Sequence, residues 1–243
     1  MGVRGRVSVR PRIASSGVFG AVTVAVAGPV AGLGFSRLIG HLPPVGPLSR
    51  LAAAVVLYGA GLAAVGVGYL ALTGRLGDLR PVRPDAEEVR LVAAVIAVLV
   101  LAWVVAVVGL AVLGVPFAGN ALTAQADGGF RISLVLLAGL SLVVIAPTEE
   151  LLYRGVVQAS LYDVTSRRRA VVAASVPFAL AHVPTLYADT SEPSAVGLSL
   201  IAVFGLSLVF GWLHARTDDI VAPTAVHGGY NCLVFCLLYL VGV

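Results

Sequence analysis

Long apolar segments alternate with short polar connections along almost the whole chain. A helix that crosses a membrane needs about 20 consecutive, mostly apolar residues, and many segments reach that length. Seven spans are predicted, near residues 13–35, 49–73, 90–114, 131–163, 169–185, 194–214 and 219–241. The pattern therefore predicts an all-α fold, a polytopic bundle of about seven transmembrane helices.

The first span follows a basic segment and could be mistaken for a signal peptide. Its apolar stretch, from Ile13 to about Phe35, is longer than the roughly 7–15 residues of a signal-peptide core, so a retained helix is expected. The fourth span, 131–163, is too long for one plain crossing and is expected to tilt or to extend past the bilayer. The polar stretch 74–90 has room for a short interfacial helix, and 184–193 is typical of a small acidic loop.

The composition is typical of an integral membrane protein. Hydrophobic residues make up 59% of the chain and charged residues only 12%, against roughly 25% charged residues in soluble domains. The net charge of +4 does not point to nucleic acid, because the basic residues lie in short connections between apolar spans. We therefore expect a multi-pass protein of the plasma membrane, with lipid as a partner and no nucleic-acid partner.

The positions of the arginines predict the orientation, because basic residues collect on the cytoplasmic side of a membrane. If the N-terminus is cytoplasmic, only Arg37, Arg50 and Arg131 fall on the outer side. The cytoplasmic segments then hold twelve arginines: Arg4, Arg6, Arg10, Arg12, Arg75, Arg80, Arg83, Arg90, Arg167, Arg168, Arg169 and Arg216. Seven spans then place the C-terminus outside.

A few polar side chains interrupt the late spans. A charge at the centre of a transmembrane helix costs about 2.5–3.5 kcal/mol, so such residues usually face the bundle interior and serve a function. They form three patterns on three helices: Glu149-Glu150-x-x-x-Arg154, Phe178-x-x-x-His182 and His227-x-x-x-Asn231. Each pattern alone also has a plain structural interpretation, as a buried ion pair that pins a helix or as a histidine packed in the core.

Helical geometry separates the two adjacent glutamates. Glu150 and Arg154 are four residues apart, so they share a helix face and can pair. Glu149 is rotated by about 100° from its neighbour and can point into a cavity. Two close carboxylates in surroundings of low dielectric constant suit general acid–base chemistry.

The depths of the three patterns in the membrane are compatible with one site. At about 1.5 Å per residue, Glu149 and His182 lie roughly 20 Å and His227 roughly 12 Å from the expected cytoplasmic helix ends. We therefore expect one active-site cavity among the last four helices, open to the cytoplasm. In such a cavity a base would activate water, and an imidazole and the amide of Asn231 would stabilise an oxyanion.

The stretches PTEELLYRG, PFALAHVP and APTAVHGGYN resemble, in this order, the motifs of the CPBP family. That family contains the CAAX prenyl endopeptidases and related bacteriocin-processing and abortive-infection proteins. The resemblance covers roughly residues 131–240, and Tyr153 stands where phenylalanine is common. It divides the chain into three N-terminal spans without a recognised motif, 1–130, and a CPBP-like catalytic core, 131–243.

The resemblance implies an intramembrane endopeptidase that acts on a membrane-anchored, possibly prenylated, peptide. By carry-over, Glu149 and His182 would activate the attacking water, while His227 and Asn231 would hold the oxyanion. Glu150 and Arg154 would orient these groups. Phe178, from the second motif, would contact the substrate.

Three alternatives stay open at this stage. The family is often described as metalloendopeptidases, and Glu149, His182 and His227 are candidate zinc ligands; because the His-Glu-x-x-His pattern is missing, glutamate-activated water is favoured. A non-proteolytic binding, immunity or scaffold protein would keep the same pocket. A transporter or proton relay also uses buried carboxylates and histidines, but the sequence shows no paired half-helices.

Overall fold

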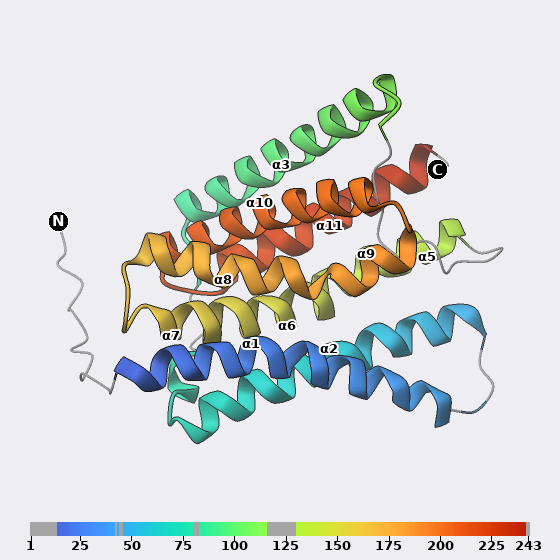
Figure 1. Ribbon diagram of the computed structural model, residues 1–243. Helices are drawn as coiled ribbons and strands as arrows, with labels where there is room; N and C mark the ends of the chain where they lie inside the picture. The colour runs from blue at the N-terminus through green and yellow to red at the C-terminus, as the bar shows by residue number, and fades with distance from the viewer. Residues whose placement is uncertain (1–13, 42, 44–45, 80–82, 116–129, 242–243) are drawn as a thin grey trace.

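The computed structural model of the protein describes residues 14–41, 43, 46–79, 83–115 and 130–241 (Figure 1). Within them, seven helical segments are long and apolar enough to cross a membrane, which confirms the predicted spans. Their elements are α1 (Ala14–Ser36) with η1 (Arg37–His41), α2 (Pro47–Leu72) followed by η2 (Leu76–Asp78), α3 (Ala86–Val112), α5 (Phe130–Leu140) to α7 (Ala159–Leu161), α8 (Arg167–Ala181) with α9 (Val183–Asp189), α10 (Pro193–Thr217) and α11 (Val221–Val241). Five of the arginines used for orientation lie outside the described residues: Arg4, Arg6, Arg10, Arg12 and Arg80.

The spans run roughly side by side, and α1 begins at the end of the bundle opposite to that where α11 ends (Figure 1). Helices α1 and α2 form one side, α8 and the fourth span lie in the middle, and α10 and α11 lie beyond them. Helix α3 lies outermost and has no buried residue among its 27, as expected for a helix whose apolar side chains face lipid.

The fourth span is one long rod whose helical geometry changes along its length. It runs through α5, the π-helical segment η3 (Ser141–Ile145), α6 (Ala146–Glu150), the π-helical segment η4 (Leu151–Gln158) and α7. Pro147 in the first turn of α6 lacks a backbone N–H and crowds the carbonyl four residues earlier, which accounts for the wider turn just before it. Glu149 and Glu150 therefore lie in a short α-helical turn between two π segments, a geometry frequent at functional sites.

The fifth span is broken at His182. There α8 ends, and α9 begins at the next residue with Pro184 in its first turn. The expectation of a loop over 184–193 was wrong for most of its length, because proline is tolerated in the first helical turn. Helix α9 also buries Leu186 against Ala195 and Val196. Among the described residues of the other polar stretch before α3, the expected interfacial helix is only the short 3₁₀ turn η2.

Helices α1 and α2 pack closely through Gly61. A Cβ atom at Gly61 would lie 2.6 Å from the backbone nitrogen of Gly32 and 2.7 Å from the carbonyl oxygen of Ala31. Backbone atoms of a helix cannot move aside as a side chain does, so this position has no room for a larger residue. The pairing of the first two spans therefore depends on this glycine.

We predict that Gly61→Ala separates α1 from α2 and destabilises the protein by about 1–3 kcal/mol, the usual cost of overpacking. The matched control is Gly68→Ala on the same helix, where an added Cβ meets no atom within 4 Å. Thermal unfolding of both variants in the same detergent measures the effect. Equal midpoints for the two variants would contradict the packing described for Gly61.

Candidate active site

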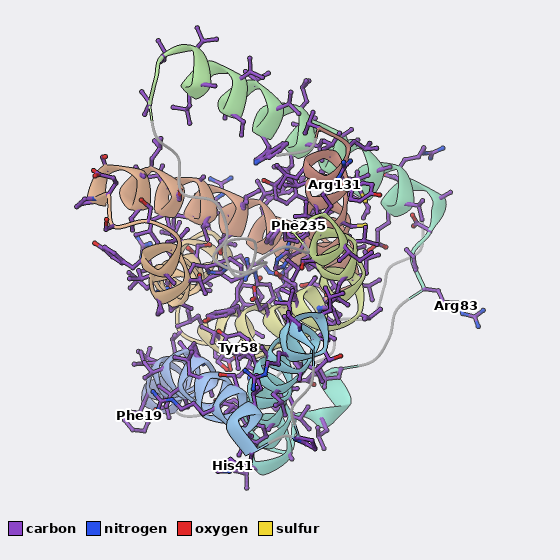
Figure 2. The ribbon with its side chains drawn as sticks, turned by 90° about the vertical axis from the view of Figure 1, so that its right-hand side faces the viewer. Phe19, His41, Tyr58, Arg83, Arg131 and Phe235 are labelled. Carbon is purple, nitrogen blue, oxygen red and sulfur yellow. The ribbon has the colours of Figure 1, made fainter. Side chains whose placement is uncertain are left out.

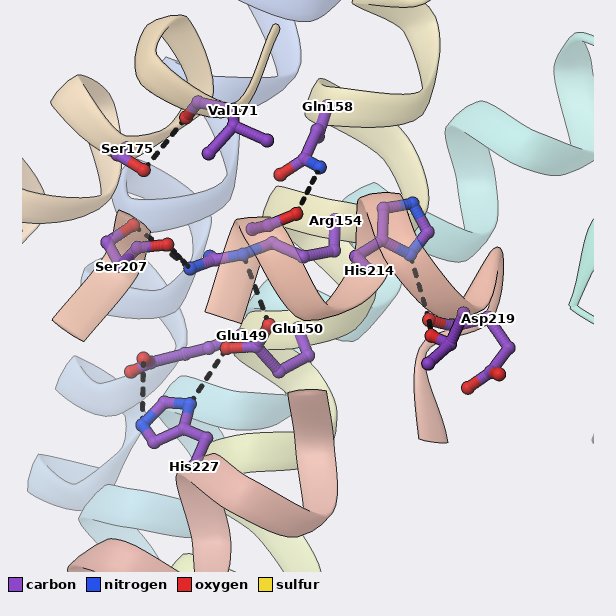
Figure 3. A network of polar contacts seen from close by, with 12 residues as sticks. Glu149, Glu150, Arg154, Gln158, Val171, Ser175, Ser207, His214, Asp219 and His227 are labelled. Carbon is purple, nitrogen blue, oxygen red and sulfur yellow. Dashed lines mark hydrogen bonds and ion pairs between the residues drawn. The ribbon is translucent and has the colours of Figure 1, made fainter. Parts of the chain in front are cut away.

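The polar side chains of three spans meet inside the bundle (Figure 3). The Nδ1 atom of His227 lies 2.9 Å from Oε1 of Glu150. Its Nε2 atom lies 3.9 Å from Oε2 of Glu149. Because a carboxylate oxygen accepts, Nδ1 carries the proton in the first contact. The imidazole is therefore placed between two carboxylates, one facing each ring nitrogen.

Arg154 holds Glu150 from the other side, as the four-residue spacing predicted. Its Nε atom lies 3.2 Å from Oε2 of Glu150, and both side chains are fully buried. Its NH2 group donates to the carbonyl oxygen of Ser207 at 3.0 Å and to the hydroxyl of Ser207 at 2.9 Å. The guanidinium carbon also lies 4.7 Å from the ring centroid of Phe178. Salt bridge, serine and aromatic ring together fix the arginine.

Aromatic packing and a close helix approach fix His227. Its ring stacks on Phe210 with centroids 4.7 Å apart and meets the edge of Phe178 at 6.0 Å. The next residue, Gly228, has little room for a side chain, because an added Cβ would lie 3.2 Å from the carbonyl oxygen of Ser141. The glycine therefore lets α11 approach η3 closely, which brings His227 next to the two glutamates.

His182 enters the site from the break between α8 and α9. Its Nδ1 atom donates to the carbonyl oxygen of Phe178 at 2.8 Å, because a carbonyl can only accept. In the neutral ring this leaves Nε2 as the hydrogen-bond acceptor. The carbonyl of His182 accepts in turn from the hydroxyl of Thr185 at 2.8 Å. Both interactions hold the histidine at the helix break.

A cavity of about 360 Å³ lies against this cluster. Glu149, His182, His227 and Asn231 line it, whereas Glu150 and Arg154 lie behind them and are fully buried. Among the described residues, Oε2 of Glu149 has no hydrogen-bond partner, although it is buried. Both oxygens of Glu150 therefore have a charged or imidazole partner within 3.2 Å, whereas Glu149 lines the cavity and contacts His227 only at 3.9 Å.

The first two helices form one wall of this cavity, which the sequence did not predict. Leu33 and Ser36 of α1, Ile39 of η1, and Tyr58 and Gly59 of α2 all line it. The expectation of a cavity among the last four helices alone was therefore incomplete. The lining also extends toward the end of α1 and the start of α2, away from the bundle end at which the cavity was expected to open.

Phe178 does not contact the cavity, in contrast to the role that the family resemblance implied. Its side chain is only 2% exposed and is absent from the cavity lining. It lies instead among the rings of Tyr153, His182 and Phe210 and beneath the guanidinium of Arg154. Phe178 therefore packs against Arg154 and His227 and holds the polar cluster in place.

Two supporting residues were not predicted from the sequence. Ser207 on α10 binds Arg154, and Gln158 donates to the carbonyl oxygen of Gly211 at 2.9 Å and to the hydroxyl of Tyr162 at 2.6 Å. Gln158 follows Arg154 by four residues, so the helical spacing carried a usable signal. Ser207 lies in an apolar helix where serines are common, and its role is visible only in the fold.

We predict that Ser207→Ala destabilises the protein by about 1.5–3 kcal/mol, the range for a hydrogen bond to a charged group. Ser175→Ala is the matched control, because Ser175 is equally buried but donates only to the carbonyl oxygen of Val171 in its own helix. Thermal unfolding in one detergent compares them. A Ser175 variant as unstable as the Ser207 variant would show that the contact with Arg154 has no special weight.

The three candidate zinc ligands do not lie together as a group among the described residues. Within the described residues, no three His, Cys, Asp or Glu side chains are grouped so that they could hold a metal ion. One nitrogen of His227 is also occupied by Glu150, and one of His182 by the carbonyl of Phe178. The side chains thus form a cluster of carboxylates and imidazoles, and its dependence on a metal stays a prediction.

Fold and site together define an integral multi-pass membrane protein with a polar, hydrolase-like cluster facing an internal cavity. Residues 131–233 match the family model described as Type II CAAX prenyl endopeptidase Rce1-like. This stretch contains all three motifs and confirms the resemblance to the CPBP family, which points to a CAAX-type intramembrane protease domain in this part of the chain. No curated protein and no solved structure matches the chain.

Proposed function

We propose that the protein cleaves a peptide bond of a membrane-anchored, possibly prenylated, substrate with a water molecule activated by Glu149 and His182. The observation that carries this proposal is the contrast between adjacent glutamates. Glu150 is engaged by Arg154 and His227 at 3.2 and 2.9 Å. Glu149 lines the cavity instead, and its Oε2 atom has only the 3.9 Å contact with His227. A buried carboxylate oxygen that accepts no hydrogen bond and faces a cavity suits a general base.

The proposed reaction needs no group beyond those that line the cavity. Glu149 takes a proton from water while the water oxygen attacks the carbonyl carbon, with Nε2 of His182 accepting the second hydrogen bond of that water. The carbonyl oxygen becomes an oxyanion, which accepts hydrogen bonds from Nε2 of His227 and from the amide of Asn231. Glu149 then gives its proton to the leaving nitrogen as the carbon–nitrogen bond breaks, which yields a carboxylic acid and an amine.

Glu150 and Arg154 act in this proposal as positioning residues. To stabilise the oxyanion, His227 carries a proton on both ring nitrogens. The Nδ1 proton binds Glu150, and the Nε2 proton is directed at the oxyanion. The positive ring then balances the second carboxylate of the cluster, since Arg154 supplies only one positive charge. Burial makes such balance important, because an uncompensated charge in surroundings of low dielectric constant is costly.

The remaining cavity lining favours an apolar segment of the substrate. Leu33, Val55, Ile145 and Phe235 line the walls beside the polar cluster, and apolar walls with a few polar groups are typical of binding sites. A peptide whose cleavage site lies next to a lipid or apolar anchor presents both kinds of surface. The proposed substrate class follows from this combination.

Cleavage by the purified protein in lipid nanodiscs tests the proposal. A panel of peptides with transmembrane, acyl or prenyl anchors would be incubated with the protein, and the products identified by mass spectrometry. We expect two fragments from at least one peptide. If every peptide binds without being cleaved, the chain is instead a binding or scaffold protein.

Metal removal is a separate arm of the same assay. We predict that a chelator leaves the cleavage rate unchanged, because the proposed water is activated by Glu149 and His182 alone. Addition of zinc after chelation is the control for non-specific effects of the chelator. Activity that disappears with the chelator and returns with zinc would contradict this mechanism and support the alternative metalloendopeptidase.

A further inference from the structure

We infer that the hydroxyl group of Tyr153 binds a hydrogen-bond acceptor of the substrate, an uncharged oxygen one or two residues away from the scissile bond. The inference rests on the proposed function and adds to it a group that selects the substrate. Three observations carry it: the position of Tyr153 beside Glu149, the absence of a hydrogen-bond partner for its hydroxyl among the described residues, and the packing of its ring.

Tyr153 lies on the same wall of the cavity as Glu149. The two residues are four positions apart on the fourth span, so their side chains share a helix face. Both line the cavity, and the charge of Glu149 acts on the phenol of Tyr153. Tyr58 of α2 and Phe235 of α11 line the same cavity from other helices, toward the middle of the bundle (Figure 2). A peptide bound at Glu149 therefore lies close to Tyr153 as well.

The hydroxyl of Tyr153 is buried without a hydrogen-bond partner among the described residues. The side chain is only 1% exposed, so bulk water does not surround the hydroxyl. Most buried polar groups in native proteins have a partner, because an unsatisfied one loses its hydrogen bonds to water without replacement. The hydroxyl would gain this missing partner from a substrate atom that enters the cavity.

The ring of Tyr153 does not by itself explain why the residue carries a hydroxyl. It meets the ring of Phe178 edge to face, with centroids 5.1 Å apart and ring planes at 74°. Phenylalanine would make the same contact without burying a polar group. The hydroxyl thus adds nothing to the packing of the free protein, which leaves it available for a ligand.

The position of the hydroxyl limits where the acceptor lies in the substrate. Four residues of a helix advance by about 6 Å, and an extended peptide advances by about 3.3 Å per residue. With the scissile bond at Glu149, the matching oxygen therefore lies one or two residues away. It belongs either to the peptide backbone or to a side chain such as that of threonine. A carboxylate is disfavoured, because it would lie near the negative charge of Glu149.

A binding cycle with matched variants and matched peptides tests the inference. Anchored peptides would carry threonine or valine at successive positions beside the anchor, since these side chains have similar shapes and only threonine offers an acceptor. Their affinities would be measured in nanodiscs for Glu149→Gln, in which cleavage is expected to be very slow, alone and combined with Tyr153→Phe or Tyr230→Phe. Tyr230 is the matched control, because it is buried but does not line the cavity.

We expect Tyr153→Phe to weaken binding about 2–10-fold, the net contribution of one neutral hydrogen bond, with no fall in the unfolding midpoint. A loss confined to threonine peptides assigns the acceptor to a side chain, and an equal loss for every peptide assigns it to the backbone. Affinities equal to those of the Tyr230→Phe protein would overturn the inference, as would a loss of affinity accompanied by a fall in the unfolding midpoint. Because binding is measured without turnover, a failed cleavage assay would overturn the proposed function and not this inference.

Discussion

Replacing Glu149 with glutamine is expected to lower the rate of peptide cleavage by about 10²–10⁴-fold, the usual contribution of a positioned general base. Glutamine has nearly the same shape but cannot take a proton from water. The buried Oε2 atom of Glu149 makes no hydrogen bond with the described residues, so this substitution should leave the fold intact. The variant should therefore bind substrate and unfold at close to the wild-type temperature while cleaving it very slowly.

The neighbouring glutamate and a distant one make this prediction specific. Glu150→Gln should reduce both the cleavage rate and the thermal stability, because Glu150 pairs with Arg154 in a fully buried contact. Glu192→Gln, at an exposed position before α10, should change neither. Cleavage rates and unfolding midpoints of all three variants would be measured in the same nanodiscs. A Glu149 variant that cleaves as fast as the wild type would exclude Glu149 as the base.

Replacing Arg154 with methionine is expected to destabilise the protein by about 3–5 kcal/mol, the usual cost of leaving one member of a buried ion pair without its partner. The side chain has no exposed surface, and its loss leaves Glu150 in the core with only His227. The hydroxyl of Ser207 also loses its donor. The unfolding midpoint in detergent measures the effect.

A double variant distinguishes the ion pair from simple packing. Glu150→Gln combined with Arg154→Met removes both charges, so it should recover much of the stability lost in Arg154→Met alone. It should not recover activity, because His227 would lack the carboxylate that orients it. Arg168→Met, on the exposed part of α8, is the control for loss of an arginine. A double variant less stable than both single variants would show that the pair is not the stabilising unit.

Much of the fold was predictable because lipid imposes a simple rule on sequence. Each membrane span must be long and apolar. Hydropathy alone therefore predicted the seven spans found among the described residues. The pairing of Glu150 with Arg154 was predictable for a similar reason, since helical spacing fixes which side chains share a face. The separation of Glu149 from that pair followed from the same geometry.

Other features depend on contacts between segments distant in the sequence. Helices α1 and α2, which form one wall of the cavity, approach closely at Gly61. No recognised motif in the first 130 residues predicts this wall. The sequence did not predict the break at His182 or helix α9, because proline and acidic residues are as typical of loops as of helix starts. The burial of Phe178 follows from aromatic packing around Arg154, which spacing along one helix does not reveal.

The most direct test of the central claim is the fate of one peptide bound in the cavity. An anchored peptide that the wild type binds would be recovered from purified complexes of the wild type and of Glu149→Gln, and its mass measured. The account predicts two fragments from the wild type and the intact peptide, still bound, from the variant. Intact peptide from both proteins would contradict it, because a protease that uses Glu149 to activate water cannot leave its bound substrate whole.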